Sequence, residues 1–299
     1  MSSALVVGGA GFVGSHLVER LLADGVAVDV VDDLSTGSLA NLADARAMDG
    51  TLKIHHLDAT TPECASLIGM RHPDVVYQLA AVPRGDLSAA RLSSAFAATV
   101  ALVEAARHHR VPKIVVALPA SALYGRPTSK EIPVKERDLV PRGARGVIAR
   151  ATVDLLEVAR DSDAVEFTAL ALGTVYGPRQ RPDQGVVAAL LAAAHDRSAP
   201  TISGDGRQTR DLVFVDDIVD ALVRAGERGS GLVINVGTGE QTSINDLWAA
   251  IAGPLATAPE SGPAAPDEVP RFALSSVRAR IHLGWSAWTS LADGLAQLR

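Results

Sequence analysis

The chain has 299 residues, of which 47% are hydrophobic and 21% charged, and its formal net charge is −6. A chain of this length can bury one large core, or one core with an added lobe. The mild acidity and the absence of a basic stripe argue against nucleic acid as a partner. The apolar stretch 186–194 is too short to span a bilayer, and the first residues lack the charged start of a secretory signal. We therefore expect a cytoplasmic protein with no membrane contact.

Cysteine and histidine give no sign of a metal site. The single cysteine, Cys64, cannot form an internal disulfide and has no neighbours at metal-ligand spacing. The adjacent histidines at 55–56 and 108–109 would point in different directions on a strand or a helix. We predict no metal, and surface or capping roles for these histidines.

A short apolar run, Ala4–Val7, predicts the first strand, and a glycine-rich turn follows it. Gly8, Gly11 and Gly14 allow unusual dihedral angles, close approach of a pyrophosphate to the backbone, and a helix packed flush on its strand. The helix expected over 15–22 would direct unpaired N–H groups and a partial positive charge at phosphates. This segment therefore predicts a dinucleotide-binding turn.

The second strand is predicted over Val26–Val31 and is followed by Asp32. An acid at this distance past the glycines is typical of a ribose-binding residue. Its carboxylate would accept hydrogen bonds from the adenosine 2′-hydroxyl and would repel a 2′-phosphate. The sequence therefore favours NAD over NADP as the cofactor.

Further strand-like runs alternate with amphipathic helical stretches. This alternation predicts an α/β protein with a Rossmann-like, doubly wound parallel sheet covered by helices on both faces. The remaining strands are expected at Leu52–Leu57, Val75–Leu79, Lys113–Leu118, Glu166–Leu172 and Leu232–Val236.

We expect an NAD-binding Rossmann domain over residues 1–172 and a smaller C-terminal substrate-binding lobe over 173–299, with segments interleaved between them. Ligands of such sheets bind at the carboxyl ends of the strands. The ends concerned are Asp58, Ala80–Ala81, 118–124 and 173–177.

Several short motifs recur in the order found in one large family. They are Gly-Gly-Ala-Gly-Phe-Val-Gly-Ser-His-Leu (8–17), Asp-Asp-Leu-Ser-Thr-Gly (32–37), Leu-Ala-Ala (79–81), Ala-Leu-Tyr-Gly (122–125), Val-Tyr-Gly-Pro-Arg-Gln (175–180), Gly-Asp-Gly-Arg-Gln-Thr-Arg-Asp (204–211), Phe-Val-Asp-Asp (214–217), Asn-Val-Gly-Thr-Gly (235–239) and Leu-Gly-Trp (283–285). With these motifs the chain resembles an extended short-chain dehydrogenase/reductase of the nucleotide-sugar epimerase and dehydratase type. The resemblance covers the whole chain.

The resemblance implies a tightly held NAD that oxidises a sugar hydroxyl, lets the intermediate rearrange and returns the hydride. Proton transfer in the family depends on a Tyr-x-x-x-Lys pair, in which the lysine binds the nicotinamide ribose and lowers the tyrosine pKa. The cofactor-binding residues implied are Gly8, Gly11, Phe12, Val13, Gly14, Asp32, Asp33, Ser35, Gly37, Asp58, Ala59, Leu79, Ala80, Ala81 and Arg150.

The Tyr-x-x-x-Lys pair is replaced. Alignment through Leu155-Leu156 puts Gly146 at the tyrosine position and Arg150 at the lysine position. The hydroxyl residue expected four places before Tyr124 is Ala120, and Ser121 lies one place late. We therefore take Ser121 and Arg150 as the candidate catalytic residues, although a guanidinium cannot act as a base near neutral pH. Tyr124, Lys130, Glu131 and Glu136 are nearby titratable groups for which a core or surface role is the favoured interpretation.

Substrate-binding positions also depart from the family. Two expected asparagines are Ala95 and Thr174, and an expected phosphate-binding arginine is Ala265. Arg179 and Arg210 remain and could pair with a diphosphate. We predict Thr174, Arg179 and Arg210 as substrate-binding residues.

Three functions remain open. The first is an enzyme that acts on a nucleotide sugar through transient hydride transfer at an atypical site. The second is a non-catalytic NAD or nucleotide-sugar binding protein, or an inactive partner subunit. The third is an NADH-dependent reductase. Apolar positions on 95–109 and 147–160 further suggest a homodimer paired through these helices, and the alternative is that they face only their own sheet. The positions are Val100, Val103, Ala106, Val153, Leu156 and Ala159.

Overall fold

The computed structural model describes residues 1–80, 88–136, 139–163, 165–253, 257–263 and 269–298. Its centre is a seven-stranded parallel sheet with the strand order β11-β6-β5-β4-β1-β2-β3. The strands are β1 (Ser3–Val7), β2 (Ala27–Asp32), β3 (Leu52–His56), β4 (Val75–Gln78), β5 (Lys113–Pro119), β6 (Glu166–Leu172) and β11 (Leu232–Val236). The predicted doubly wound α/β sheet is confirmed, and every strand expected from the sequence is present.

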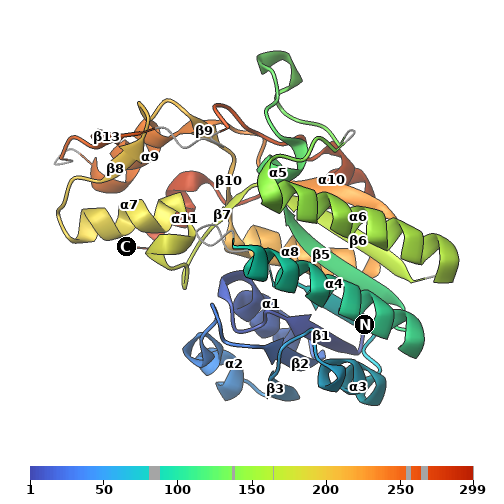
Figure 1. Ribbon diagram of the computed structural model, residues 1–299. Helices are drawn as coiled ribbons and strands as arrows, with labels where there is room; N and C mark the ends of the chain where they lie inside the picture. The colour runs from blue at the N-terminus through green and yellow to red at the C-terminus, as the bar shows by residue number, and fades with distance from the viewer. Residues whose placement is uncertain (81–87, 137–138, 164, 254–256, 264–268, 299) are drawn as a thin grey trace.

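Helices cover both faces of the sheet (Figure 1). One apolar core joins one sheet face to α1 (Phe12–Ala23), α2 (Ala43–Ala47) and α8 (Val215–Glu227). A second core joins the other face to α3 (Pro62–Arg71), α4 (Ala89–His109), α5 (Ala120–Tyr124) and α6 (Gly143–Asp163). Inner strands buried on both faces require mainly apolar residues, which makes them recognisable in the sequence, whereas the edge strand β3 is only partly buried.

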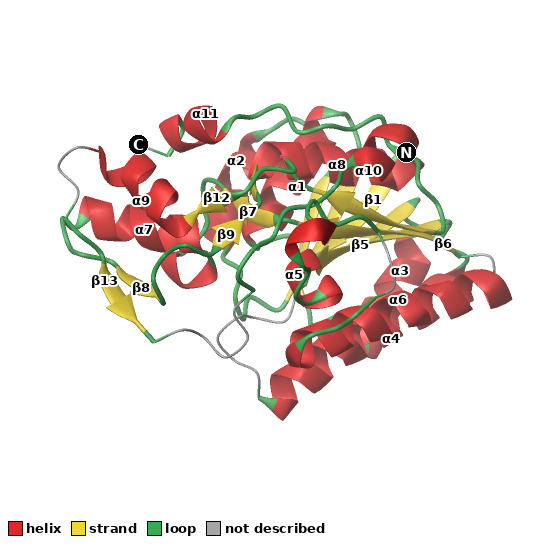
Figure 2. Cartoon of the chain, turned by 90° about the horizontal axis from the view of Figure 1, so that it is seen from above, coloured by secondary structure: helices red, strands yellow, loops and turns green. Residues whose placement is uncertain are grey.

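A smaller lobe lies beyond the carboxyl ends of the strands and is built from short strand pairs and helices (Figures 1 and 2). The pairs are β10 (Leu212–Phe214) with β7 (Thr174–Tyr176), β12 (Thr242–Ser243) with β9 (Thr209–Arg210), and β13 (Glu260–Gly262) with β8 (Thr201–Ser203). The lobe helices are α7 (Val186–His195), α9 (Ile244–Ala252) and α11 (Leu291–Ala296), and α10 (Val277–His282) contacts β11. Short 3-10 turns occupy Leu39–Leu42, Ser129–Glu131 and Pro182–Gln184. β11 belongs to the central sheet and α8 packs on that sheet. Two segments from beyond residue 172 are therefore built into the sheet and its helical cover.

The helices α4 and α6 lie side by side along one face of the molecule (Figures 1 and 2). Among the described helices, α4 alone is long and apolar enough to cross a membrane, a property it shares with core helices of globular proteins. Ala98, Leu102 and Ala106 of α4 are buried in the second core. The helix therefore serves as part of the layer that covers the sheet.

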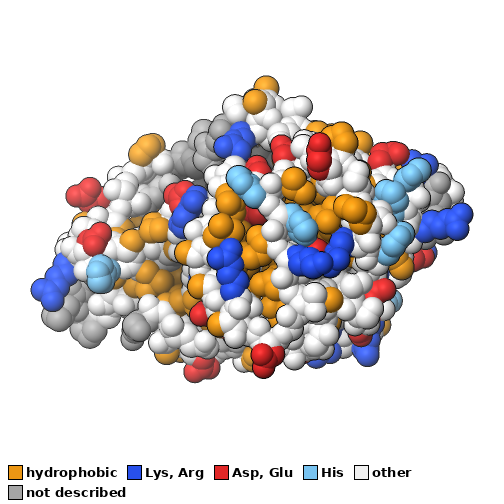
Figure 3. Space-filling model, turned by 90° about the horizontal axis from the view of Figure 1, so that it is seen from below, with side chains coloured by type: hydrophobic (Ala, Val, Ile, Leu, Met, Phe, Trp, Pro, Cys, Tyr) orange, Lys and Arg blue, Asp and Glu red, His pale blue; other side chains and the backbone are white. Residues whose placement is uncertain are grey.

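Charged side chains of both signs are interspersed with histidines over the face that lies below in Figure 1 (Figure 3). Elsewhere on the sheet, His55 has a defined structural role, because its Nε2 lies 2.8 Å from a carboxylate oxygen of Asp29. Arg71 Nε donates to the other oxygen of the same carboxylate at 2.8 Å. The expected surface role of His55 is consistent with this three-residue contact.

Lys113 is a buried cation at the amino end of β5. Its side chain is held by the carbonyl oxygen of Arg228, at 2.6 Å from Nζ, and by Ser230 Oγ at 3.1 Å. Burial lowers the pKa of the Lys113 ammonium from 10.5 to about 8. In the unfolded chain this lysine keeps its ordinary pKa, so between these two values the unfolded state binds more protons than the folded state.

We therefore expect the free energy of unfolding to rise with pH, relative to a Lys113→Met variant, between about pH 8 and pH 10.5. Methionine is a suitable reference because it fills the stem volume without a charge. The carbonyl oxygen of Arg228 also keeps a hydrogen bond from Thr168 Oγ1 at 3.0 Å. Urea unfolding of both proteins across this range measures the difference, and parallel stability curves would contradict the lowered pKa.

Candidate functional site

The turn between β1 and α1 is shaped by its glycines. Gly8 has a φ of +79°, and a Cβ placed there would lie 2.9 Å from the backbone nitrogen of Ala80. The backbone nitrogen of Gly11 donates to the carbonyl oxygen of Gly8 at 3.1 Å. A Cβ on Gly14 would collide with that same carbonyl oxygen. The turn thus leaves an open cradle of backbone with no side chain to fill it.

Gly11 is also the N-cap of α1, and no side chain caps the first turn of that helix. Among the described residues no side-chain cap bond to the first turn of α1 occurs, and no acidic residue stands in that turn. Phe12 and Val13 begin the helix directly beside this opening. Free helix N–H groups together with the helix dipole attract an anion such as a diphosphate.

Asp32 lies at the end of β2 and is 7% exposed. One carboxylate oxygen accepts from the backbone nitrogen of Ala10 at 2.8 Å, and the other accepts from that of Leu34 at 2.9 Å. Burial raises the pKa of this carboxyl, and the two backbone hydrogen bonds act in the opposite direction. The carboxylate is thereby tied to the glycine turn, and its remaining lone pairs can accept from ribose hydroxyls.

The other predicted cofactor residues lie around the same strand ends. Asp33 accepts from the backbone nitrogen of Ser35 at 2.9 Å. A Cβ on Gly37 would lie 3.0 Å from an Asp32 carboxylate oxygen. Asp58 accepts from Thr60 in the turn after β3. Ala59 follows this aspartate in the same turn, Leu79 and Ala80 follow β4, and Ala81 lies outside the described residues.

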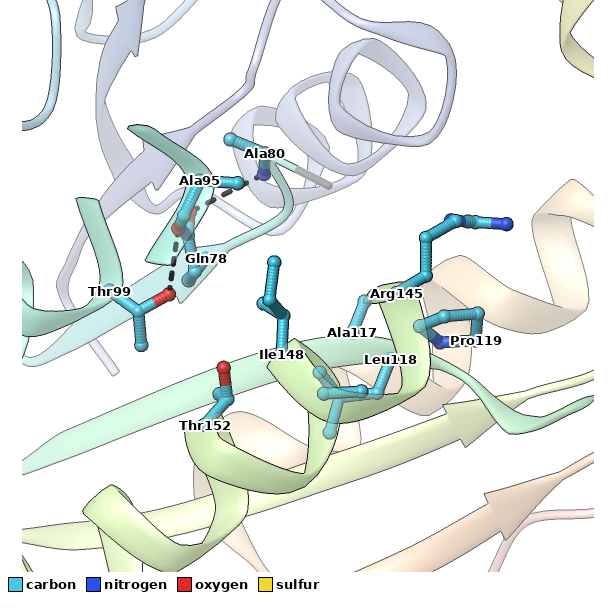
Figure 4. Close-up of a pocket in the computed structure, with 11 residues that line it drawn as sticks. Gln78, Ala80, Ala95, Thr99, Ala117, Leu118, Pro119, Arg145, Ile148 and Thr152 are labelled. Carbon is cyan, nitrogen blue, oxygen red and sulfur yellow. Dashed lines mark hydrogen bonds between the residues drawn. The ribbon is translucent and has the colours of Figure 1, made fainter. Parts of the chain in front are cut away.

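A hollow opens at the carboxyl ends of β4 and β5 (Figure 4). It lies between these strand ends and the helices α4 and α6. Its lining is mostly small or apolar, and Arg145 is the single ionisable side chain among the described residues that line it. The lining residues are Gln78, Ala80, Ala95, Thr99, Ala117, Leu118, Pro119, Arg145, Ile148, Ala149 and Thr152.

Gly146 and Arg150 do not line this hollow, and the cofactor-binding and catalytic role of Arg150 stays a prediction. Arg150 Nε donates to Asp154 at 2.8 Å, and one terminal nitrogen donates to the carbonyl oxygen of Leu139 at 3.2 Å. A Cβ on Gly146 would collide with the carbonyl oxygen of Ala122. An α-helix turns about 100° per residue, so a shift of one residue directs a side chain elsewhere. The residues of α6 that face the hollow are Arg145, Ile148, Ala149 and Thr152.

Arg150 instead lines a separate, more polar hollow of about 940 Å³ beside β11 and α10. Tyr124 lies in that wall as well and is 1% exposed, with its hydroxyl donating to Asn235 Oδ1 at 2.8 Å. Glu136 accepts from the backbone nitrogen of Asn235 at 2.9 Å. Tyr124 and Glu136 are therefore structural, as expected, and this cluster joins β11 to the loop before α6.

Lys130 and Glu131 belong to a short surface turn. Glu131 accepts from the backbone nitrogen and the hydroxyl of Thr128 and so closes a capping box. Lys130 is exposed in the same 3-10 turn. Their expected surface role agrees with this geometry.

Ser121 is half-buried on α5 and is not among the residues that line the hollow. The lining part of β5 ends at Pro119, and Ala120 is completely buried. Membership of Ser121 in the catalytic centre therefore stays a prediction. Ser121 lies one residue after the position expected for the hydroxyl group, and its side chain does not line the hollow.

Arg179 is held by helix α1 rather than directed at a substrate. Its guanidinium donates to Glu19 at 2.6 Å, to Asp44 at 3.2 Å and to Ser15 Oγ at 3.1 Å. Both carboxylates engage the guanidinium, and the substrate-binding role of Arg179 stays a prediction. The segment after β7 is fastened to the cofactor side by this ion pair.

Thr174 and Arg210 lie on neighbouring parts of the lobe. The backbone nitrogen of Thr174 donates to the carbonyl oxygen of Asp211 at 2.7 Å. Arg210 donates to the carbonyl oxygens of Thr209 at 2.7 Å and Val269 at 2.8 Å. Both residues are half-buried, and their substrate-binding role stays a prediction.

The parallel sheet, the glycine turn and the acid at the end of β2 define a dinucleotide-binding protein. The model of the NAD dependent epimerase/dehydratase family matches residues 4–237. The chain therefore belongs to this family, whose members use NAD.

Named relatives lie within the nucleotide-sugar branch. The chain is 39% identical to a UDP-glucose 4-epimerase of Mycolicibacterium smegmatis, over 98% of this chain and 96% of the relative. Its fold is similar to the UDP-glucose 4-epimerase of Thermotoga maritima with UDP-glucose, with a TM-score of 0.91, 30% identity, and 99% and 96% of the two chains covered. A Thermus thermophilus UDP-glucose 4-epimerase complexed with NAD gives a TM-score of 0.88, 29% identity, and coverage of 98% and 96%.

Replacing Asp32 by alanine is expected to weaken NAD binding by about ten- to hundredfold. The change removes two acceptors for buried N–H groups and one ribose acceptor, and each hydrogen bond to a charged group contributes about 1.5–3 kcal/mol. Discrimination against NADP should fall as well, because the charge that repels a 2′-phosphate is lost. Calorimetric titration with both dinucleotides measures these effects.

The matched control is Asp24→Asn, which removes an equal charge from an exposed residue at the end of α1. Its affinity for NAD should equal that of the unmodified protein. An unchanged NAD affinity in Asp32→Ala would overturn the position given to the adenosine ribose.

Proposed function

We propose that this protein binds NAD and a nucleoside diphosphate sugar at a site that lacks the tyrosine-based proton transfer of its family. The glycine turn fits the diphosphate of NAD, because its open backbone and uncapped helix start suit an anion. Asp32 suits the adenosine ribose. The surrounding strand ends, including Asp33, Ser35, Gly37, Asp58, Ala59 and Leu79, would complete the cofactor site.

The observation that carries the proposal is the composition of the hollow. A guanidinium is the one ionisable group among the described lining residues, and its pKa is above about 12, so Arg145 cannot remove a proton near neutral pH. Arg145 and Ala149 have the spacing of the family's Tyr-x-x-x-Lys pair and both face the hollow. We therefore assign these two residues, rather than Gly146 and Arg150, to the pair's positions.

Bound NAD would supply the hydride chemistry, and the residues of this chain would supply binding and orientation. General acid–base catalysis contributes about two to four decades of rate, so ordinary epimerisation should be slower by at least that factor. Arg145 could still polarise an oxygen of the sugar without accepting its proton. Its contribution would then be electrostatic.

The sugar nucleotide would occupy the smaller lobe, close to Thr174 and Arg210. Similarity to UDP-glucose 4-epimerases supports a nucleoside diphosphate hexose as the ligand class. In this proposal residues 1–172, completed by α8 and β11, hold the cofactor, and most of residues 173–299 hold the sugar nucleotide.

The test begins with the NAD content of the purified protein, followed by calorimetric titration with UDP- and dTDP-hexoses and uronates. The same compounds are then incubated with the protein, and the products are separated by chromatography and identified by mass. We expect binding of NAD and of at least one sugar nucleotide, with no new isomer. Failure to bind either ligand would overturn the proposal.

An active epimerase is the second candidate, favoured by the 39% identity to a UDP-glucose 4-epimerase along nearly the whole chain. In that case the incubation yields an isomer, or a product lighter by water for a dehydratase. Net oxidation of NADH with a carbonyl compound would instead identify a reductase. Each function thus gives a different product.

The protein would act in the cytoplasm as a homodimer. The residues predicted from the sequence for the dimer interface need correction. Val103, Ala106, Val153, Leu156 and Ala159 are buried within this chain and face their own core. The outer surface of α6 instead exposes Val147 by 59% and Val158 by 62%. A second copy could cover these side chains, and sedimentation of the protein as a monomer would contradict that assembly.

A further inference from the structure

The side-chain amide of Gln78 is a buried donor directed into the hollow. Gln78 ends β4 and is 5% exposed. Its Oε1 accepts from the backbone nitrogen of Ala80 at 3.3 Å, which fixes the orientation of the amide (Figure 4). Its Nε2 has no hydrogen-bond partner within the part of the chain that the structure describes. A buried amide donor left in this state is unfavourable, so an acceptor atom on a ligand would stabilise it.

Thr152 supplies a second polar group from the opposite wall. It is 3% exposed on α6 and lines the hollow, and no hydrogen bond to its hydroxyl occurs among the described residues. Thr99 differs, because its hydroxyl already donates to the carbonyl oxygen of Ala95 at 3.3 Å. The hollow therefore offers an amide donor and a hydroxyl that both donates and accepts. Ala149, which also lines the hollow, provides no charge.

The position of Gln78 relative to the glycine turn limits what can reach it. Strand β4 is the neighbour of β1, and Gln78 is in register with Val7, the residue before the turn. Asp32 lies on the other side of β1, at the end of β2. A dinucleotide with its adenosine ribose at Asp32 and its diphosphate over the turn must extend its second nucleoside across β4. Its second ribose then lies over the hollow.

We propose that Gln78 and Thr152 bind the hydroxyl groups of the nicotinamide ribose of NAD through neutral hydrogen bonds, in place of a lysine at position 149. This inference rests on the proposed binding of NAD. A ribose presents two vicinal hydroxyls, each able to donate and accept, and this matches an amide donor facing a hydroxyl. The small side chain of Ala149 leaves the room in which the ribose approaches both groups.

The experiment compares three ligands that differ only at the nicotinamide end. NAD and ADP-ribose both carry the second ribose, whereas ADP lacks it. Calorimetric titration is carried out with the full-length protein and with Gln78→Leu, Thr152→Val and the double variant. We expect each single change to weaken NAD and ADP-ribose by roughly fivefold to tenfold, and the double change by more, because a hydrogen bond contributes on the order of one decade in affinity. ADP should bind to all of them equally well.

Matched controls separate binding from folding. Thr99→Val alters the same hollow, but its hydroxyl is already engaged, so affinities should change by less than about twofold. Thr152→Ser keeps the hydroxyl and should restore ADP-ribose binding. Equal weakening of ADP in the Gln78 and Thr152 variants, or undiminished ADP-ribose binding, overturns the inference. If the unmodified protein binds neither NAD nor ADP-ribose, the proposed function itself is wrong. That outcome differs from the two above, which overturn only the role of Gln78 and Thr152.

Discussion

Replacing Arg145 by tyrosine and Ala149 by lysine together is expected to raise turnover of a bound nucleotide sugar by about two to four decades. The two positions are separated by one helical turn and both line the hollow at the ends of β4 and β5. A lysine ammonium beside a tyrosine lowers the tyrosine pKa, which lets the phenol act as a base near neutral pH. Both new side chains would start from positions that line the hollow.

The informative comparison is Gly146→Tyr with Arg150→Lys, which installs the same pair one residue later. At position 146 a Cβ collides with the carbonyl oxygen of Ala122, so this variant should lose stability and gain no activity. Turnover is measured by product formation with a sugar nucleotide that each variant binds. A gain in the 146/150 variant alone would contradict the orientation of α6. No gain in the 145/149 variant, with both ligands bound, would mean that the missing pair is not the main obstacle.

Most of the central sheet could be predicted because its inner strands are buried on both faces and are mainly apolar, whereas the edge strand β3 is only partly buried and contains Lys53, His55 and His56. The expected ends of 52–57 and 75–79 differ by one residue from those of β3 and β4. The glycine turn was also recognisable, since Gly8, Gly11 and Gly14 occur at positions where a side chain would meet backbone. These features depend on local sequence, which explains why they needed no tertiary information.

The orientation of α6 could not be fixed in the same way. Between Tyr124 and this helix the chain forms a short 3-10 turn and an isolated bridge from Val134 to Leu274, and neither has a period that fixes the residue count. One residue of error rotates the helix by about 100°. A usable signal was present, since Arg145, Ile148, Ala149 and Thr152 follow the i, i+3, i+4, i+7 spacing of one helix face.

The role of Arg179 depended on contacts that the sequence does not contain locally. Its partners Glu19 and Asp44 are 160 and 135 residues away along the chain. A basic residue in a family motif looked suited to a diphosphate, but α1 and α2 place two carboxylates beside it. Gln78 was missed for a related reason, because its amide orientation depends on Ala80 and on the wall formed by α6.

Replacing Gly14 by alanine is expected to lower NAD affinity by roughly a hundredfold or more, because charge-assisted hydrogen bonds contribute about 1.5–3 kcal/mol each and each 1.4 kcal/mol is tenfold. The added methyl group would collide with the carbonyl oxygen of Gly8 and lie 2.8 Å from the Cα of Gly9. Both contacts are backbone, so α1 must move away from the turn. The N–H groups at its start would then no longer converge on the diphosphate.

Calorimetric titration with NAD and with ADP measures this loss, and thermal unfolding shows how much of the fold is kept. The control is Gly69→Ala in α3, where the added methyl group meets the movable ring of His109 rather than backbone. That change should leave NAD affinity unaltered, since α3 packs on the opposite face of the sheet from α1. ADP and NAD should weaken by the same factor in Gly14→Ala, because both carry the diphosphate. Loss of NAD binding with ADP binding intact would place the effect at the nicotinamide end. That result would contradict the explanation through the glycine turn.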